Sequence, residues 1–293
     1  MVIFNATGRE YKGNLHMHTR RSDGARAPLD AVLAYEAEGY DFLAITDHRM
    51  VTTVKDYRGR MLLLPGIEMD EQLSRQEVIH LLGIGGNARI LGGYRAGMTS
   101  QEGIDLANHA GGLCFLAHPH WSMNRLETVR SLSGLAGVEL FNSASTYPYN
   151  PDRADSTHIL DLLASDGLLF NTTAADDTHH YGSEFARSYV LIQADSLSAG
   201  SVLETLRAGR YYASQGPRFL SVRLEGGLVV VTSSPVSHVL FHSNLPWNDG
   251  RAVSGDHLVR ATYQPDLARG ENFIRVILVD SEGRRAWMQP FAV

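Results

Sequence analysis

The chain has 293 residues, of which 44% are hydrophobic and 20% are charged, and its formal net charge is −6. This composition is typical of a folded globular protein and excludes a disordered or collagen-like chain. General nucleic-acid binders usually carry a basic excess, so the acidic balance argues against extended nucleic-acid binding.

The ends and the single cysteine give expectations about location. The first residues show no basic stretch followed by a long apolar run, so we expect no signal peptide. No segment approaches the roughly 18 consecutive apolar residues of a spanning helix, and we expect no membrane association. Cys114 is the one cysteine and cannot form an intrachain disulfide. We therefore expect a cytoplasmic protein of undetermined oligomeric state.

Strand-like apolar runs alternate with helical patterns as far as about residue 210. The predicted strands are 11–18, 42–46, 61–68, 78–84, 113–118, 137–141 and 168–172. The predicted helices are 29–38, 99–110, 151–165 and 198–208, and each of them stops at or shortly before a glycine. Alternation of this kind is typical of parallel βα units, and seven strands in about 200 residues suit a barrel, incomplete or distorted.

The sequence changes in character after Gly216-Pro217. Short predicted strands cover 219–224, 228–233, 237–241, 257–263, 272–280 and 285–291, with turn signals and no convincing helix between them. Regular short strands are typical of a small antiparallel β-sandwich. We therefore predict an α/β protein with two domains, a barrel at 1–214 and a sandwich at 215–293.

Residues of metal-binding type stand at the ends of several predicted strands. In a strand, His16 and His18 point to the same face and can bind one ion. Asp23 follows in a loop, where it could equally be a plain turn residue. The same pattern recurs with Asp47-His48, Glu68, His80, His118 and Asp177-Thr178-His179. Since barrel strands end at one rim, these residues predict a metal cluster and point to hydrolysis.

These segments resemble, in order, the polymerase and histidinol phosphatase (PHP) family. The resemblance rests on His16-x-His18, Ser22-Asp23-Gly24, Thr46-Asp47-His48, Pro65-Gly66-Ile67-Glu68, His80, Ala117-His118-Pro119 and Asp177-x-His179, and it covers roughly residues 11 to 190. It implies a distorted (βα)7 TIM-like barrel with two or three metal ions at its C-terminal rim, up to a trinuclear metal centre.

The resemblance also implies which residues hold each ion. The first ion would be held by His16, His18, Glu68 and Asp177, the second by Glu68, His80 and His118, and the third by Asp23, His48 and His179. Glu68 would then bridge two ions. Mixed histidine and carboxylate ligands suit Mn, Fe or Zn.

The implied chemistry is hydrolysis of an ester bond. Two ions bridged by a carboxylate can bind a shared hydroxide, which would attack phosphorus without a covalent phosphoenzyme. We expect Glu68, Asp177 and His179 to act in catalysis by holding the ions. His120 and His180 are candidates for protonating the leaving group, although a rim position with no role is an equal alternative. Asp47 and Asp176 are expected to orient ligands or to cap a strand, and a role as metal ligand is the less favoured alternative.

A phosphate substrate also favours positively charged partners. Arg20, Arg21, Arg49 and Arg187 lie next to the motifs, and arginine can hold phosphate oxygens with two parallel hydrogen bonds. Each one taken singly is more often a solvated surface residue, but we expect at least one to contact the substrate. Asn142 and His180 are further candidates for substrate binding.

Three classes of function remain open. The first is a phosphoesterase acting on a small phosphomonoester or phosphodiester, of the nucleotide or short-oligonucleotide class. The second is a carboxylic-ester or carbamate hydrolase, because a PHP core followed by a β domain is similar to the branch that includes carbamate-insecticide hydrolases. An apolar pocket without clustered arginines would favour the second class. The third is a non-catalytic binding protein with structural metals.

Overall fold

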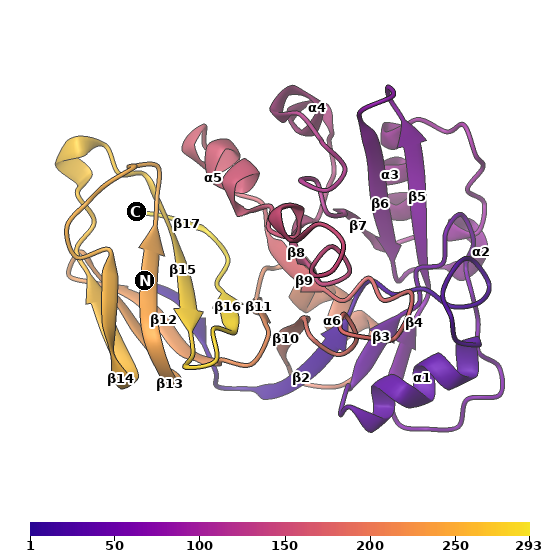
Figure 1. Ribbon diagram of the computed structural model, residues 1–293, viewed down its shortest axis with the longest axis horizontal. Coiled ribbons are helices and arrows are strands. Elements are labelled where there is room, and N and C mark those ends of the chain that lie inside the picture. The colour runs from indigo at the N-terminus through magenta and orange to yellow at the C-terminus, as the bar shows by residue number, and fades with distance from the viewer.

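The computed structural model describes residues 1–293 and shows a mixed α/β protein, as predicted. Figure 1 shows two parts side by side, a part that carries all the α-helices on the right and an all-strand part on the left. The helices are α1 (Pro28–Ala37), α2 (Ala88–Leu91), α3 (Ser100–His109), α4 (Leu126–Ser131), α5 (Thr157–Ser165) and α6 (Ala199–Arg207). None of the helices combines the length and the apolar character needed to cross a membrane.

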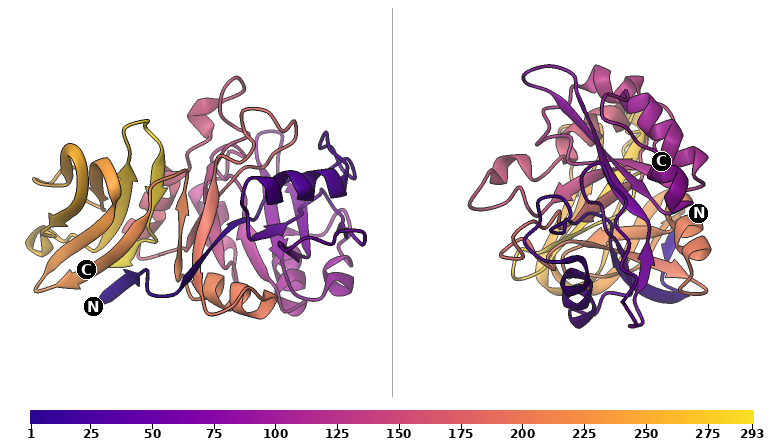
Figure 2. Two further views of the ribbon diagram at one scale, coloured as in Figure 1. Left: turned by 90° about the horizontal axis from the view of Figure 1, so that it is seen from below. Right: turned by 90° about the vertical axis from the view of Figure 1, so that its right-hand side faces the viewer.

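Helices α1 and α3 begin where the sequence places their caps, whereas α5 begins at Thr157 and not at the predicted residue 151. Pro28 occupies the first turn of α1, where a missing backbone N–H costs nothing. Thr99 and Glu102 form a reciprocal capping box at the start of α3. Figure 2 shows the helices on the outside of the strands of this part, so the strand ends remain free to carry the site.

The strands of the helical part belong to two sheets. They are β2 (Arg9–Asn14), β3 (Phe42–Ala44), β4 (Leu62–Leu64), β5 (Gly66–Gln72), β6 (Val78–Ile84), β7 (Leu113–Leu116), β8 (Gly137–Asn142), β9 (Thr172–Ala175), β10 (Tyr189–Ala194) and β11 (Tyr211–Ser214). One sheet has the order β5-β6-β7-β8-β9, and the other contains β11-β10-β2-β3-β4. Pairing is parallel within β2-β3-β4 and within β7-β8-β9.

Antiparallel pairs interrupt the parallel pattern that the sequence suggested. The predicted strand 61–68 is divided at Pro65, so β4 pairs with β3 while β5 pairs with β6. Proline has no N–H for a ladder, which makes it a natural break between strands. β5 and β6 are joined by the short loop 73–77, and a connection of that length forces an antiparallel hairpin.

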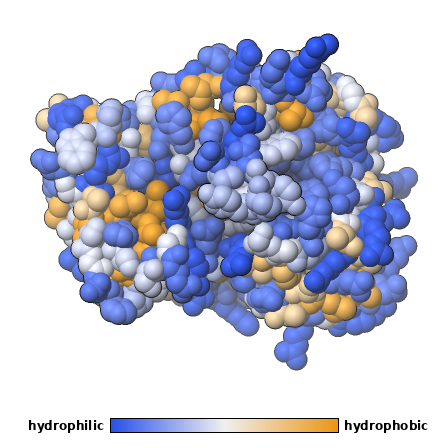
Figure 3. All heavy atoms as spheres, viewed as in Figure 1, coloured by the Kyte–Doolittle hydropathy of each residue, from blue (hydrophilic) through white to orange (hydrophobic).

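The all-strand part contains β12 (Phe219–Glu225), β13 (Leu228–His242), β14 (Ala252–Tyr263), β15 (Phe273–Val279), β16 (Arg285–Trp287) and β17 (Phe291–Ala292). All their pairings are antiparallel, as predicted. β13 unites two predicted strands, with irregular register around Pro235. The strand β1 (Val2–Asn5) pairs with β12, so the first residues lie on this sheet. In Figure 3, hydrophobic side chains gather on the left, over this part.

The two parts share a continuous sheet and a polar interface. β16 pairs with β11 across the junction. The Trp287 ring is stacked at 5.3 Å on Phe141. The Gln289 amide accepts from the backbone N–H of Thr172 and donates to its carbonyl oxygen. The buried Arg275 guanidinium donates to both carboxylate oxygens of Asp161, on α5. The all-strand part therefore covers strands of the helical part.

Candidate metal centre

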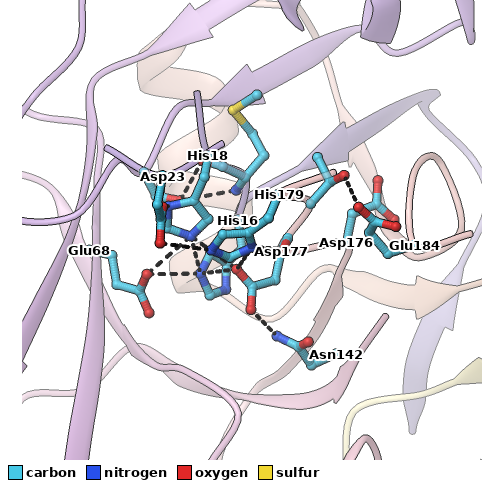
Figure 4. A network of polar contacts seen from close by, with 12 residues as sticks. His16, His18, Asp23, Glu68, Asn142, Asp176, Asp177, His179 and Glu184 are labelled. Carbon is cyan, nitrogen blue, oxygen red and sulfur yellow. Dashed lines mark hydrogen bonds and ion pairs between the residues drawn. The ribbon is translucent and has the colours of Figure 1, made fainter. Parts of the chain in front are cut away.

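The structure brings the nine predicted metal ligands together at one rim. Figure 4 labels His16, His18, Asp23, Glu68, Asp177 and His179 among them. Glu68 lies in β5 and His80 lies in β6. Most of the others come shortly after a strand ends: His16 and His18 after β2, His48 after β3, His118 after β7, and Asp177 and His179 after β9. Asp23 lies in the loop that follows His18. Gly24 allows the loop of Asp23 to pack close, because a Cβ there would lie 2.4 Å from the His18 carbonyl oxygen.

The first set of possible ligands is fully buried among the strand ends. The Nε2 atoms of His16 and His18 lie 3.3 Å from each other. Both Nε2 atoms lie 3.0–3.1 Å from the Oδ1 atom of Asp177 and 3.1–3.3 Å from the Oε2 atom of Glu68. Donor atoms about 2.1 Å from one ion stand roughly 3.0–3.4 Å apart, so this set has the spacing of a coordination shell.

Glu68 joins this set to a second one. Its Oε1 atom lies 2.7 Å from Nδ1 of His80 and 3.4 Å from Nε2 of His118. The same carboxylate therefore faces the first set with one oxygen and the second set with the other. This is the arrangement that a bridging ligand requires.

The third set lies nearest the surface. Asp23 places its Oδ2 atom 3.5 Å from Nε2 of His48 and 3.4 Å from Nε2 of His179. Its other oxygen lies 3.5 Å from Nδ1 of His18, so His18 lies between the first and third sets. Asp23 is half exposed, whereas Glu68 is buried. The cluster thus opens to solvent at this end.

Two buried carboxylate oxygens indicate that the cluster fits divalent cations. Glu68 Oε2 and Asp177 Oδ1 are inaccessible to solvent and have no hydrogen-bond partner. A buried acceptor without a partner costs free energy, and an ionised one costs more. Both oxygens face the imidazole nitrogens of the first set, so a cation held there would satisfy them. The mixture of nitrogen and carboxylate donors suits Mn, Fe or Zn.

The buried carboxylates and imidazoles of the cluster shift each other's pKa values. Burial alone would raise the pKa of Glu68, but the His16 and His80 imidazoles hold it well below its usual range. Burial would lower the pKa of His18, yet the Asp177 and Glu68 carboxylates raise it to about 9. The carboxylates thus remain ionised and favour the protonated form of the neighbouring imidazoles.

Backbone strain also concentrates at the rim. His118 and Asp177 have positive φ angles of 25° and 51°. Residues with a Cβ rarely adopt this region, and such strain is commonly found at functional sites. The backbone therefore turns sharply at the two strand ends that present these side chains.

Glu139, which the sequence analysis did not identify, orients the buried ligands. Its Oε1 atom lies 3.1 Å from Nδ1 of His16, and its Oε2 atom accepts from the backbone N–H of His118 and the Asn142 amide. A carboxylate on the far nitrogen fixes the tautomer of a metal-binding imidazole and makes it a better donor. A carboxylate between Val138 and Leu140 in an apolar strand was the signal available in the sequence.

We expect Glu139→Gln to lower metal affinity and turnover by about 10- to 100-fold, the usual effect of removing such an orienting carboxylate. Glutamine keeps the size and can still bond to Asn142, so the fold should persist. Metal titration with a circular dichroism control checks this. Unchanged metal affinity would show that Glu139 only fills space.

Asp47 and Asp176 accept hydrogen bonds from backbone N–H groups and hydroxyls, and they do not enter the cluster. Asp47 accepts from Thr19, Ser22 and Thr52. Asp176 accepts from three consecutive N–H groups at residues 186–188 and from the Tyr35 hydroxyl. Burial nevertheless raises the pKa of Asp176 to about 7. Asp47 thus stabilises the loop that contains Asp23, and Asp176 stabilises the segment that follows His179.

A cavity of about 340 Å³ opens above the cluster. It is lined by Asp23, His48, Glu68, His80, His118, Trp121, Ala144, Ser145, Tyr149, Asp177, His179, His180 and Glu184. No lysine or arginine is among them. A volume in this range suits a small ligand.

The predicted substrate-binding arginines lie elsewhere. Arg20 is exposed and donates to the Ala25 carbonyl oxygen, and Arg21 is exposed as well. Arg49 borders an adjoining hollow but forms a two-pronged ion pair with Asp70. Arg187 donates to Ser183 and lines a separate pocket between the two parts.

The other predicted polar residues differ in position. His180 lines the cavity. Asn142 is buried beneath it and donates to Asp177 Oδ2 at 3.0 Å. His120 does not line the cavity, and its Nδ1 atom lies 2.8 Å from the Asp155 carbonyl oxygen.

The chain shares its fold with a solved structure. No protein-family model and no curated protein matches the chain. Among solved structures, it is similar to a two-domain protein from Bacteroides vulgatus that contains a predicted PHP-like metal-dependent phosphoesterase. The identity is 14% and the TM-score 0.56, over 100% of this chain and 97% of the other. The likeness therefore extends over both parts.

Two further solved structures are similar over less of the chain. An amidohydrolase from Chromobacterium violaceum has 16% identity and a TM-score of 0.40, over 59% of this chain and 89% of its own. A lesion-specific endonuclease from Pyrococcus furiosus has 13% identity and a TM-score of 0.46, over 68% and 56%.

Proposed function

We propose that this protein is a metal-dependent hydrolase of the PHP type that acts on small phosphate esters. The observation that carries the proposal is Glu68, whose two oxygens face two different sets of metal ligands. The fold shared with a protein that contains a predicted PHP-like phosphoesterase supports it. On this proposal, the two sheets within residues 9–214 make up a distorted (βα)7 barrel.

The donor sets would hold up to three ions. The first would be bound by His16, His18, Glu68 and Asp177, the second by Glu68, His80 and His118, and the third by Asp23, His48 and His179. Divalent ions there would supply Lewis acidity, which stabilises charge on a phosphoryl group and makes water nucleophilic near neutral pH.

The chain's own side chains supply orientation and a proton. Asn142 and Glu139 hold Asp177 and His16 in place. We assign leaving-group protonation to His180, because its side chain is exposed in the cavity. His120 is less suited to this role, since it does not line the cavity and its Nδ1 atom is engaged by a backbone carbonyl.

Hydrolysis of a carboxylic ester or carbamate is the second candidate. The cavity contains no arginine or lysine that would pair with phosphate, and its walls include two aromatic rings. Both features suit a neutral ester. The same cations would polarise a carbonyl oxygen as readily as a phosphoryl oxygen.

One assay panel tests the choice. Mn-reconstituted protein is given chromogenic phosphomonoester, phosphodiester, carboxylic-ester and carbamate substrates, beside His16→Ala and the surface control His109→Ala. We expect turnover of a phosphate ester that is lost in His16→Ala and kept in His109→Ala. Turnover of carbonyl esters alone would establish the second candidate. No turnover by a metal-loaded protein would contradict both and favour a binding protein.

A further inference from the structure

Two large aromatic side chains stand exposed at the cavity. Trp121, just beyond β7, is 42% exposed, and Tyr149, in the loop after β8, is 63% exposed. Both line the cavity above the cluster. A solvent-exposed aromatic ring at a cavity wall gains free energy when a ligand packs against its face.

Trp121 is positioned by the second set of ligands. Its ring lies edge-on to His118, with ring centres 5.1 Å apart at 76°, and 6.0 Å from His80. The indole is therefore held beside two imidazoles of the cluster. A ligand group that contacts Trp121 would therefore lie next to His80 and His118 of the metal cluster.

Tyr149 approaches the cavity beside the third set. Its ring lies 6.2 Å from the His180 imidazole at 27°, and His180 lies 6.4 Å from His179. The loop that carries Tyr149 is tied to the site, because the backbone N–H and the hydroxyl of Ser145 both donate to the side-chain Oδ1 atom of Asn142. Asn142 in turn donates to Asp177. Trp121 thus borders two ligands of the second set, whereas Tyr149 borders His180, which lies beside His179 of the third set.

Charge does not account for ligand selection in this cavity. None of its thirteen lining residues is a lysine or arginine. Arg49, which borders an adjoining hollow, is paired with Asp70. Beyond the metal cluster, Trp121 and Tyr149 are the largest apolar side chains of the cavity wall, which also contains Ala144.

We propose that Trp121 and Tyr149 bind a flat aromatic group of the substrate, so that the preferred substrates are phosphate esters that carry an aryl ring or a nucleobase. This inference rests on the proposed phosphoesterase function. Aromatic side chains stack on any flat ring, so both sources share one recognition chemistry. The acidic net charge fits small esters of this kind rather than long nucleic acids.

The test measures binding by calorimetry to Mn-loaded protein, with ligands matched in pairs. Phenylphosphonate and ethylphosphonate differ in one ring. The methylenephosphonate analogues of AMP and of ribose 5-phosphate differ in one base. None of the four contains a phosphate ester bond that the protein could hydrolyse. We expect the ring-bearing ligand to bind at least about tenfold more tightly than its partner. Trp121→Leu and Tyr149→Leu should each reduce that preference by up to about tenfold. Neither substitution should change the affinity for the ring-free ligands.

Matched controls are available in the chain. Tyr147→Leu alters an exposed tyrosine two residues from Tyr149 that does not line the cavity, and Trp247→Leu alters an exposed tryptophan in the all-strand part. Both should keep the ring preference. A preference within the AMP pair alone would identify a nucleobase, and a preference in both pairs would identify aryl groups in general.

Equal affinity within both pairs, or Leu variants that weaken both members alike, would overturn the inference. Its failure is separable from that of the proposed function. Ring-dependent binding without turnover of any phosphate ester would contradict the phosphoesterase and keep the aromatic site. Turnover of phosphate esters without ring-dependent binding would do the reverse.

Discussion

Replacing Glu68 with alanine is expected to lower turnover by about a thousandfold or more. The Glu68 carboxylate faces His16, His18 and His48 with one oxygen and His80 and His118 with the other. Its loss would remove the link between two donor sets and the charge that each ion needs. Steady-state kinetics on the best substrate of the panel, with metal content measured on the same samples, checks this.

Glu71→Ala is the matched control for that variant. Glu71 lies on the same strand, β5, but its carboxylate accepts from Ser100 at the start of α3. This variant should lose some stability and keep its activity. If Glu68→Ala retains activity near that of Glu71→Ala, the assignment of the bridging ligand is wrong.

Asp161→Asn is expected to lower the free energy of unfolding by about 3 kcal/mol at pH 7. Arg275 is 1% exposed and donates to both oxygens of Asp161, so the variant would leave a buried guanidinium without its counter-charge. This pair joins α5 to β15, across the interface of the two parts. Urea unfolding of wild type and variant measures the difference, and exposed Asp256→Asn serves as the control.

The difference should depend on pH in a definite direction. Burial would raise the pKa of Asp161, but His242 and Arg275 hold it below its ordinary value. A depressed folded-state pKa contributes stability above the unfolded-state value of about 3.9, and this contribution is lost as the pH falls through the folded-state pKa. The gap between wild type and Asp161→Asn should therefore narrow below pH 4. A gap that widens on acidification would contradict this, because it would mean that folding favours the protonated form of Asp161.

The candidate ligands could be predicted from the sequence because their positions depend on local pattern. His16 and His18 share a strand face, and the other polar residues follow apolar runs, so their convergence required only that the strand ends meet. The structure brings them together. Strand direction was less accessible, because the break at Pro65 and the β5–β6 hairpin depend on which strands become neighbours.

The supporting residues depend on contacts across the chain. Glu139 meets His16 from a strand 123 residues away, and no local signal indicates that contact. Arg49 was a candidate phosphate ligand because it follows His48, yet its guanidinium is paired with the carboxylate of Asp70 on β5. The aromatic walls come from two separate loops. Pairing of this kind is decided by tertiary packing.

Metal titration of chelator-stripped protein tests the central claim most directly. Activity is followed on the best substrate while bound Mn is counted by mass spectrometry, with His16→Ala in parallel. We expect stripped protein to be inactive, activity to rise with bound metal and level off at two or three equivalents, and His16→Ala to bind fewer ions and stay inactive. Full activity in stripped protein, or equal metal binding and activity in His16→Ala, would contradict a hydrolytic metal centre built from these residues.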